Sequence, residues 1–192
     1  MPLLFRLPPR SAATARALEN YAENVDIFPT LAELAGIAVP PRCRTEEESQ
    51  SLALCTEGVS LAPLIEPAPP PHHRRGSAAT TRRRVASKVA SFWQWPKMMI
   101  EKLPVMGYSL ATDDGGASFR YTEWVYYNYT GSGRGGGQGC ETCMDWSRGY
   151  GTELYNLTAD PAESRNIHGS AVAAKGLEAR LSSMLHAGWR RL

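Results

Sequence analysis

The sequence predicts a two-layer α+β fold in which an antiparallel sheet is covered by a C-terminal helix. Two β-rich runs between Val105 and Tyr127 flank an Asp-Gly turn signal, which is typical of a hairpin. A further β-rich run precedes this hairpin, and the tail carries an apolar stripe at helical spacing. Because an isolated hairpin is only marginally stable in water, we expect the third strand and the helix to support it.

The hairpin turn is expected at 113–116, where the chain reads Asp-Asp-Gly-Gly. Side chains alternate along a strand, so the second arm has two faces. One face carries Phe119, Tyr121, Glu123, Val125 and Tyr127, and the other carries Arg120, Thr122, Trp124 and Tyr126. Because both faces carry aromatic residues, we expect a central strand that a helix covers on one side and that is partly exposed on the other.

The other elements follow from local patterns. We expect the third strand over Val85–Trp95 and a last short strand over 151–157. The tail helix has an apolar stripe made of Leu177, Leu181, Met184 and Leu185. A second helix is expected over Asp26–Ala35, with Asp26 as N-cap, Pro29 in the first turn and Gly36 at C′. The apolar run at 2–7, which prolines end, predicts one buried strand.

Composition excludes several classes of protein. The chain has 192 residues and 43% hydrophobic content, which is enough for the core of an ordinary domain. Its formal net charge of +2 is too small to argue for a nucleic-acid partner. The clustered arginines lie in a Pro-rich stretch without interleaved aromatics, so we interpret 66–84 as a linker. The glycine run at 131–139 lacks the Gly-Lys-Ser/Thr of a phosphate-binding loop, so we reject a nucleotide site.

The sequence also bears on the compartment. No apolar run approaches the roughly 20 residues that span a bilayer, so no transmembrane segment is expected, and the first apolar run is too short for a signal-peptide core. Glycosylation sequons begin at Asn128 and Asn156, and the four cysteines form two local pairs. Together these features favour a lysosomal or secreted protein. Because they conflict with the missing signal, we hypothesise that the start of this chain is not the start of the protein.

The cysteines allow several chemistries. A bridge between Cys43 and Cys55 would close a loop of about a dozen residues and contribute about 2–3 kcal/mol, and two free thiols are the alternative. Cys140 and Cys143 form a C-x-x-C, which could be a redox pair or half of a zinc site. Tetrahedral zinc needs a second pair in register, and Cys43 and Cys55 lack that spacing. We therefore favour a local disulfide or free thiols at Cys140 and Cys143.

No complete active site can be assembled from the residues alone. A hydrolase needs an activated nucleophile, a base or metal, and a group that neutralises developing negative charge. The four histidines, at 72, 73, 168 and 186, form no His-x-x-x-His and stand near no acidic cluster. Asp113 and Asp114 are better explained as turn residues than as metal ligands. We therefore predict no catalytic residue and no metal ligand in this chain.

Several motifs resemble the C-terminal part of the sulfatase family, within the alkaline-phosphatase-like superfamily, and in particular its iduronate branch. They are the runs 2–8, 25–36, 39–43 with 55–58 and Leu61, 94–97, 106–109 with 120–125, and Glu153-Leu-Tyr155 with Asp160, Pro161, Glu163 and Asn166. The helix run and the last motif are widespread in the family. Pro-Pro-Arg-Cys43 and Met106-Gly-Tyr-Ser are more specific, and the loop from Cys43 to Cys55 resembles a disulfide-closed loop of that branch.

The resemblance implies hydrolysis of a sulfate ester on a sugar. The family uses a formylglycine, made within Cys-x-Pro-x-Arg, and a calcium ion held by acidic and amide side chains. This chain has no Cys-x-Pro-x-Arg, and by the resemblance the acidic metal-binding segments of the family would precede Met1. Neither cofactor is therefore expected in this chain, and its partner would be a missing N-terminal sulfatase domain. The implied domains are an α/β superfamily fragment at 1–65, the linker at 66–84 and a C-terminal subdomain at 85–192.

Three residues are carried over as substrate-facing. They are Gln94, Trp95 and Lys97; a cation suits a carboxylate or sulfate, and an indole can stack on a sugar. The alternative for each is a loop residue that packs against the missing domain, whereas we expect Tyr108, Arg120 and Trp124 to be structural. As a fragment, the chain should expose apolar surface at Leu3, Leu4, Phe5 and the Asp26–Ala35 helix.

Two other functions compete with a sulfatase fragment. The first is a non-catalytic carbohydrate-binding or interaction module that reuses the C-terminal subdomain, which would have to fold cooperatively as a monomer. The second is a redox or zinc protein built on Cys140 and Cys143, whose folding would depend on metal or on redox state.

Overall fold

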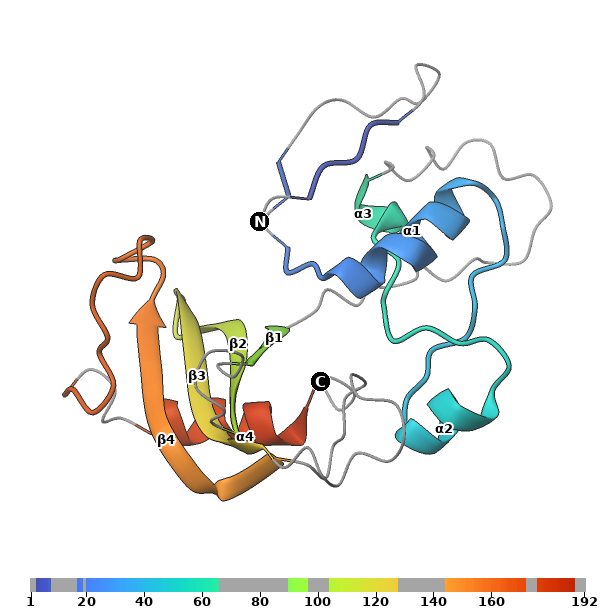
Figure 1. The fold of residues 1–192 in the computed structure, drawn as a ribbon. Coiled ribbons are helices and arrows are strands. Elements are labelled where there is room, and N and C mark those ends of the chain that lie inside the picture. Colours follow the sequence, from blue (N-terminus) through green and yellow to red (C-terminus); the bar gives the residue numbers. More distant parts are fainter. Residues whose placement is uncertain are drawn as a thin grey trace. The chain divides into compact units, whose positions relative to one another are not determined.

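The computed structural model of the chain describes residues 3–7, 17–18, 20–65, 90–96, 104–127, 144–171 and 176–188. The chain divides into two compact units, Met1–Lys88 and Val89–Leu192. Figure 1 shows helices in the first unit and a sheet with one helix in the second. Each unit is described by itself below.

The first unit is built from short helices. A 3-10 turn, η1 (Asn24–Asp26), leads directly into α1 (Ile27–Leu34), which is followed by α2 (Glu46–Ser51) and α3 (Ala62–Ile65). Helix α1 contacts α3, and their buried residues include Thr30, Ala32 and Ala62. The helix expected over Asp26–Ala35 is therefore confirmed to within one residue at each end. Gly36 has a φ of +71°, the left-handed conformation expected at C′.

The start of α1 differs from the expected cap. Asp26 stands at the N-cap position, but its side chain does not cap α1. Instead its Oδ2 accepts a hydrogen bond from the Glu23 N–H at 2.8 Å, in a capping box around η1. Its Oδ1 accepts a hydrogen bond from the Val59 N–H at 2.7 Å. The carboxyl group of Asp26, which is fully buried, thus ties the helix start to a segment 33 residues later.

The prediction of a strand at 2–7 is wrong for the residues that the structure describes. Residues 3–7 have no regular secondary structure, and Leu3 and Leu4 are 41% and 90% exposed. A strand needs a neighbouring backbone for its hydrogen bonds. Within the described residues of the first unit, the structure shows no named strand, although Arg42 and Thr56 form an isolated bridge.

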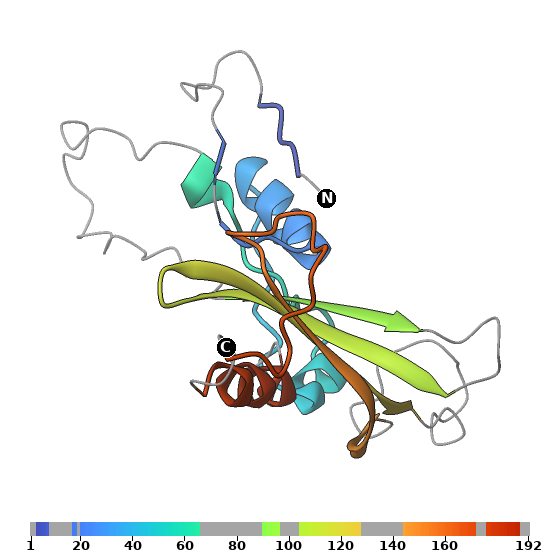
Figure 2. The ribbon, with the colours of Figure 1, turned by 90° about the vertical axis from the view of Figure 1, so that its left-hand side faces the viewer.

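The second unit is a four-stranded antiparallel sheet with one helix on it (Figures 1 and 2). The strands β1 (Ala90–Pro96), β2 (Val105–Asp114), β3 (Ala117–Tyr127) and β4 (Met144–Asn156) lie in that order. Helix α4 (Leu177–Ala187) packs Leu177, Leu181 and Leu185 against the sheet. The sheet contributes the buried side chains of Tyr108, Leu110, Phe119, Tyr121, Val125 and Leu154 to this core. The predicted two-layer α+β class, with its antiparallel sheet and covering helix, is confirmed.

The hairpin also agrees with its prediction. Its two-residue turn is Gly115-Gly116, with φ values of +60° and +83°, as a type I′ turn requires. Strand β3 lies between β2 and β4 and is therefore central. The predicted third strand corresponds to β1, which begins at Ala90, while 85–89 lies outside the described residues.

The last strand is longer than expected. Strand β4 begins at Met144 rather than at 151, so the sheet has four substantial strands instead of three and a short one. Gly149 and Gly151 interrupt the alternation of side chains that marks a strand, so the first half of β4 could not be recognised in the sequence. The pairing of β3 with β4 shifts register on both sides of Val125, opposite these glycines. Such an irregularity absorbs the extra residues without ending the strand.

Candidate functional site

The predicted substrate-facing residues lie on or after the edge strand β1. The backbones of Gln94 and Trp95 pair with Tyr108 and Gly107 of β2. The side chains of both residues, and the whole of Lys97, lie outside what the structure describes. The sheet therefore brings two of the three backbones into register with β2, and the role of all three side chains stays a prediction.

On the neighbouring strands β2 and β3, the indole ring of Trp124 packs against the backbone of Gly107. Trp124 on β3 pairs with Gly107, and a Cβ atom added at Gly107 would lie 2.7 Å from the Trp124 ring. The indole Nε1–H of Trp124 donates a hydrogen bond to Glu153 Oε1 at 3.1 Å. A glycine at 107 is therefore needed for close packing, and Trp124 has a structural partner on β4.

The tyrosines near this edge belong to the core. Tyr108 and Tyr121 are 6% and 5% exposed. Burial raises the pKa of both phenols far above the ordinary value, and the hydrogen bond from the Tyr121 hydroxyl to Glu123 Oε1, at 2.8 Å, raises that of Tyr121 further. Phenols held neutral in this way do not act as bases near neutral pH.

Arg120 is held by a turn of the chain that follows β4. Its guanidinium forms an ion pair with Glu163 and stands 5.3 Å from the centroid of the Tyr155 ring. Glu163 has a φ of +55° and is the one non-glycine residue with positive φ in the described part of the chain. A side chain in this conformation carries strain of about 1 kcal/mol or more, so the ion pair helps to stabilise an unfavourable backbone.

The rest of that turn is locked by hydrogen bonds. Asn166 Oδ1 accepts from the Leu154 N–H at 2.9 Å and from the His168 N–H at 3.0 Å, while its Nδ2 donates to the Thr152 carbonyl at 3.2 Å. Asp160 Oδ2 accepts from the Arg165 N–H at 2.9 Å, and this bond lowers the pKa of Asp160. These residues fasten the turn to β4.

The structure describes the asparagine of only one of the two sequons. Asn128 lies outside the described residues, whereas Asn156 ends β4. The Oδ1 atom of Asn156 accepts hydrogen bonds from the N–H groups of Thr158 and Ala159 at 3.1 and 3.0 Å. This Asx-type turn gives Asn156 a structural role, and glycosylation at either asparagine stays a prediction.

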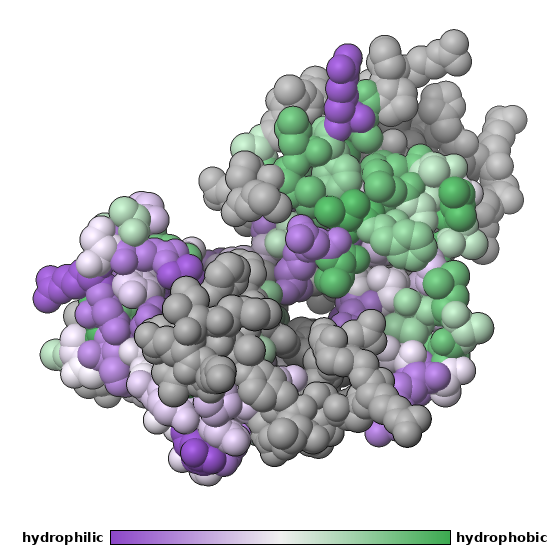
Figure 3. All heavy atoms as spheres, in the orientation of Figure 1, coloured by the Kyte–Doolittle hydropathy of each residue, from purple (hydrophilic) through white to green (hydrophobic). Residues whose placement is uncertain are grey.

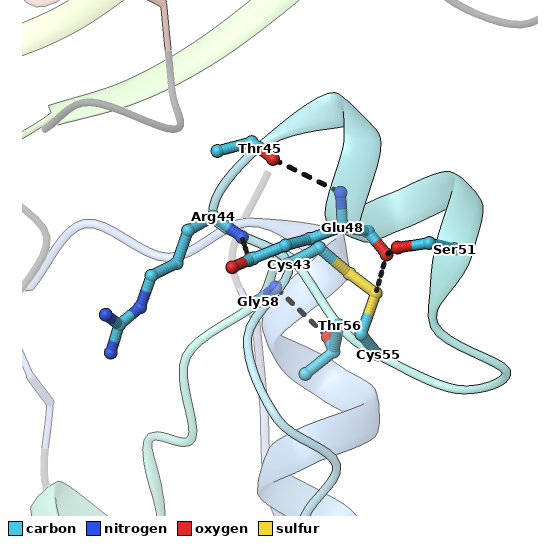
Figure 4. Close-up of a disulfide and its surroundings, with 8 residues drawn as sticks. All are labelled: Cys43, Arg44, Thr45, Glu48, Ser51, Cys55, Thr56 and Gly58. Carbon is cyan, nitrogen blue, oxygen red and sulfur yellow. Dashed lines mark hydrogen bonds between the residues drawn. A yellow bond between two sulfur atoms is a disulfide. The ribbon is translucent and has the colours of Figure 1, made fainter.

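A disulfide closes the loop that contains α2 (Figure 4). Cys43 and Cys55 are joined, with Cα atoms 5.4 Å apart. Inside the loop, Thr45 Oγ1 accepts from the Glu48 N–H at 3.2 Å, and Glu48 Oε2 accepts from the Arg44 N–H at 2.6 Å. Thr45-x-x-Glu48 is the spacing of a capping box, a helix signal that our sequence analysis missed.

A surface groove of about 600 Å³ lies beside this loop. Its lining includes the apolar Val39, Pro40, Pro41, Leu52 and Pro63 and the charged Glu33, Arg42, Arg44 and Glu48. Figure 4 shows the Arg44 side chain extending away from the disulfide. Two cations and two anions balance, so the groove has no net charge that would select an anionic sugar.

The described residues do not fit a calcium ion. Calcium needs six to eight oxygen ligands, several of them carboxylates. The structure brings no group of three or more His, Cys, Asp or Glu side chains together in the part of the chain that it describes. Asp113 accepts from Ser118 Oγ, and Asp114 pairs with Arg180, as expected of structural residues at a turn. Cys140 and Cys143 lie outside the described residues.

Comparison with known proteins shows that the chain is related to the sulfatases, as its motifs indicated. No family model matches the chain. The curated relatives are iduronate 2-sulfatases: that of Mus musculus is 32% identical over 158 residues, which cover 80% of this chain and 26% of the relative. That of Homo sapiens is 28% identical over 196 residues, which cover 88% of this chain and 33% of the relative. The resemblance to the iduronate branch is therefore confirmed.

The chain was also matched to a solved structure. The structure of BT4656 in complex with its substrate, D-glucosamine-2-N,6-O-disulfate, superposes with a TM-score of 0.44 at 22% identity, over 85% of this chain and 23% of that chain. The present chain thus spans about a quarter to a third of the curated relatives that it matches. Within the described residues, no helix is long and apolar enough to cross a membrane.

Proposed function

We propose that this chain is the C-terminal part of a sulfatase that hydrolyses sulfate esters of sugars, as an iduronate-2-sulfatase-like enzyme would. In this role it contributes to the substrate cleft and lacks the catalytic nucleophile and the metal site. The observation that carries the proposal is the similarity to iduronate 2-sulfatases over four fifths or more of this chain, against a third or less of those proteins.

The apolar surface of the first unit supports this proposal. We define that surface by Leu3, Leu4, Val25, Phe28, Leu31 and Ile37, which are 41–90% exposed. Figure 3 shows hydrophobic residues gathered on this unit. Surfaces of this kind mark contacts with another protein part, because exposed apolar area is unfavourable in water. The proposed occupant is the remainder of the sulfatase fold, with residues 1–65 as its last edge and 85–192 as the C-terminal subdomain.

The missing chemistry would come from that remainder. Sulfate-ester hydrolysis needs a nucleophile and a cation that neutralises the sulfate. Formylglycine and calcium would supply both. This chain contains no Cys-x-Pro-x-Arg from which a formylglycine could be made, and its described residues bring no three ligand side chains together for a metal ion. The contribution of this chain would then be to orient the sugar through Gln94, Trp95 and Lys97, with Lys97 pairing with a carboxylate or sulfate.

The compartment follows from the same proposal. A disulfide between Cys43 and Cys55 persists in an oxidising environment, and sequons are used in the secretory pathway. We therefore propose a lysosomal or secreted enzyme.

The first experiment is to read the transcript upstream of Met1. An in-frame extension with Cys-x-Pro-x-Arg and paired aspartates supports the proposal, and its product should release sulfate from 2-O-sulfated iduronate disaccharides. A stop codon directly upstream, with a start mapped to Met1, sinks the enzyme proposal. In that case a soluble monomer that binds sulfated sugars would establish the alternative, a non-catalytic carbohydrate-binding module.

The substrate-facing assignment has its own test in the extended product. Lys97→Gln should raise KM about tenfold with little change in kcat, because a charge-assisted contact contributes about 1–2 kcal/mol to binding. Arg165→Gln removes the same charge from an exposed side chain of the turn after β4 and should leave both constants unchanged. Equal effects of the two substitutions would show that Lys97 has no specific contact with substrate.

A further inference from the structure

In the described part of the sheet, β4 has a neighbouring strand on one side only. Strand β3 lies beside it, and the other side of β4 is an edge of the sheet. Along an antiparallel edge strand, every second residue points its backbone N–H and C=O groups away from the sheet. Such groups are a template on which a strand of another molecule can add. The partners of these outward groups therefore decide whether the sheet can extend beyond one chain.

The segment that follows β4 returns along this edge and takes the place of a further strand. The Leu154 N–H donates to Asn166 Oδ1 at 2.9 Å, and the Leu154 carbonyl accepts the Ile167 N–H at 2.8 Å. Two residues earlier, the Thr152 carbonyl accepts a hydrogen bond from Asn166 Nδ2 at 3.2 Å. Residues 152 and 154 thus face outward, and one amide side chain serves both of them.

The Asn166 amide is itself held in place. Its Oδ1 also accepts the His168 N–H at 3.0 Å, which fixes the orientation of the amide. At the other end of the returning segment, the Asn156 carbonyl of β4 accepts the Asp160 N–H at 2.8 Å. Asp160 Oδ2 accepts the Arg165 N–H at 2.9 Å, which ties the two ends of the turn together. The segment therefore lies along the edge as a strap that is hydrogen-bonded at both ends.

We propose that Asn166 closes the edge of β4 to strand addition by a second copy of this chain. Without its amide, the Leu154 N–H and the Thr152 carbonyl lose these partners, and an extended backbone offers the same donor and acceptor. The same edge of a second copy is the expected occupant, because two identical edges can pair antiparallel about a two-fold axis. This role concerns the second unit alone and does not depend on the proposed function.

Asn166→Ala in the full 192-residue chain opens the edge and tests the proposal. At low chain concentration, we expect the Leu154 amide to exchange about fivefold faster than in the parent chain, since one hydrogen bond is lost. At high concentration its protection should return, because a second copy then occupies the edge. Light scattering should show a rise in mass beyond that of the parent chain at the same concentration.

A second substitution shows whether the association uses this edge. Residue 152 points its backbone away from β3, so a proline there removes an outward N–H and leaves the pairing with β3 intact. Asn166→Ala combined with Thr152→Pro should therefore stay at the mass of the parent chain, while Leu154 still exchanges faster. Arg165→Gln is the matched control in the same turn and should change neither mass nor exchange.

Three outcomes overturn the proposal. The first is that Asn166→Ala leaves Leu154 exchange as it is in the parent chain. The second is that exchange rises but the variant gains no mass over the parent chain at high concentration. The third is that the double variant associates as strongly as Asn166→Ala. Should Asn166→Ala not fold, Asn166→Ser decides by the same measurements, because serine is neutral and too short to serve both Leu154 and Thr152.

Discussion

Gly58 offers the sharpest test of how the first unit is held together. A Cβ atom added at Gly58 would overlap the Val25 carbonyl oxygen and lie 2.5 Å from its carbon and 2.9 Å from the Asp26 nitrogen. Every one of these neighbours is backbone, so no side chain can move aside. In Gly58→Ala the two backbone segments must separate, which pulls the 58–61 segment away from α1.

The cost can be worked from the contacts that this separation breaks. The Val59 N–H donates to the buried Asp26 carboxyl group at 2.7 Å, and the Leu61 N–H donates to the buried Thr30 Oγ1 at 2.9 Å. A hydrogen bond to a carboxylate is worth about 1.5–3 kcal/mol and a neutral one about 1 kcal/mol. The expected loss is therefore about 3 kcal/mol, which is more than a hundredfold in the unfolding equilibrium of this unit.

Hydrogen exchange and fluorescence distinguish the two units in this assay. All five tryptophans lie after Lys88, so urea unfolding followed by tryptophan fluorescence reports the second unit. We expect Gly58→Ala to raise exchange in α1 more than a hundredfold while the fluorescence transition stays in place. Gly149→Ala is the matched control, because nothing lies within 4 Å of its Cβ position. Substitutions at the surface ordinarily change stability by less than about 0.5 kcal/mol. If both variants changed the free energy of opening of α1 by less than this, the close approach of Gly58 to Val25 would not contribute to the stability of the first unit.

Three further predictions concern the core, the disulfide and the phenols. Leu181 is 1% exposed at the interface of sheet and helix. Its substitution by Ala should lower the free energy of unfolding of the second unit by about 2–5 kcal/mol, so that the fluorescence transition occurs at a lower urea concentration. Replacing both Cys43 and Cys55 by Ala should lower the free energy of unfolding of the first unit by about 2–3 kcal/mol, measured from hydrogen exchange in α1 at increasing urea concentrations. A reductant should lower the stability of the parent chain and leave that of this variant unchanged. Because the pKa values of Tyr108 and Tyr121 are raised above 10.0, stability should be complete below about pH 10 and fall above it; a flat fluorescence midpoint up to pH 11.5 would contradict this.

The candidate site could be predicted only in part. The motifs at 94–97 pointed to the edge strand β1, and the structure places the backbones of Gln94 and Trp95 there. Their side-chain roles depend on what lies across from them, which a local pattern does not contain. His168 and His186 were visible in the sequence only as isolated residues, because the carboxylates that they contact, those of Glu178 and Glu123, lie 10 and 63 positions away.

Some local signals were present and were read incompletely. Thr45-x-x-Glu48 has the spacing of a capping box, and the structure has α2 beginning there. The first half of β4 gave no such signal, because glycines at 149 and 151 disrupt the alternation that marks a strand. Its pairing with β3 comes from the sheet, which accepts the interruption as a register shift.

The sequence by itself determined the features that depend on neighbours a few residues apart. Gly115-Gly116 specifies the hairpin turn because both residues need positive φ, and Leu177, Leu181 and Leu185 specify a covering helix because they recur on one face. Only the tertiary structure decided that Asp26 binds Val59 and that Glu123 meets His186. Those contacts join segments distant in sequence, and their geometry is set by packing of the whole unit rather than by local backbone preference.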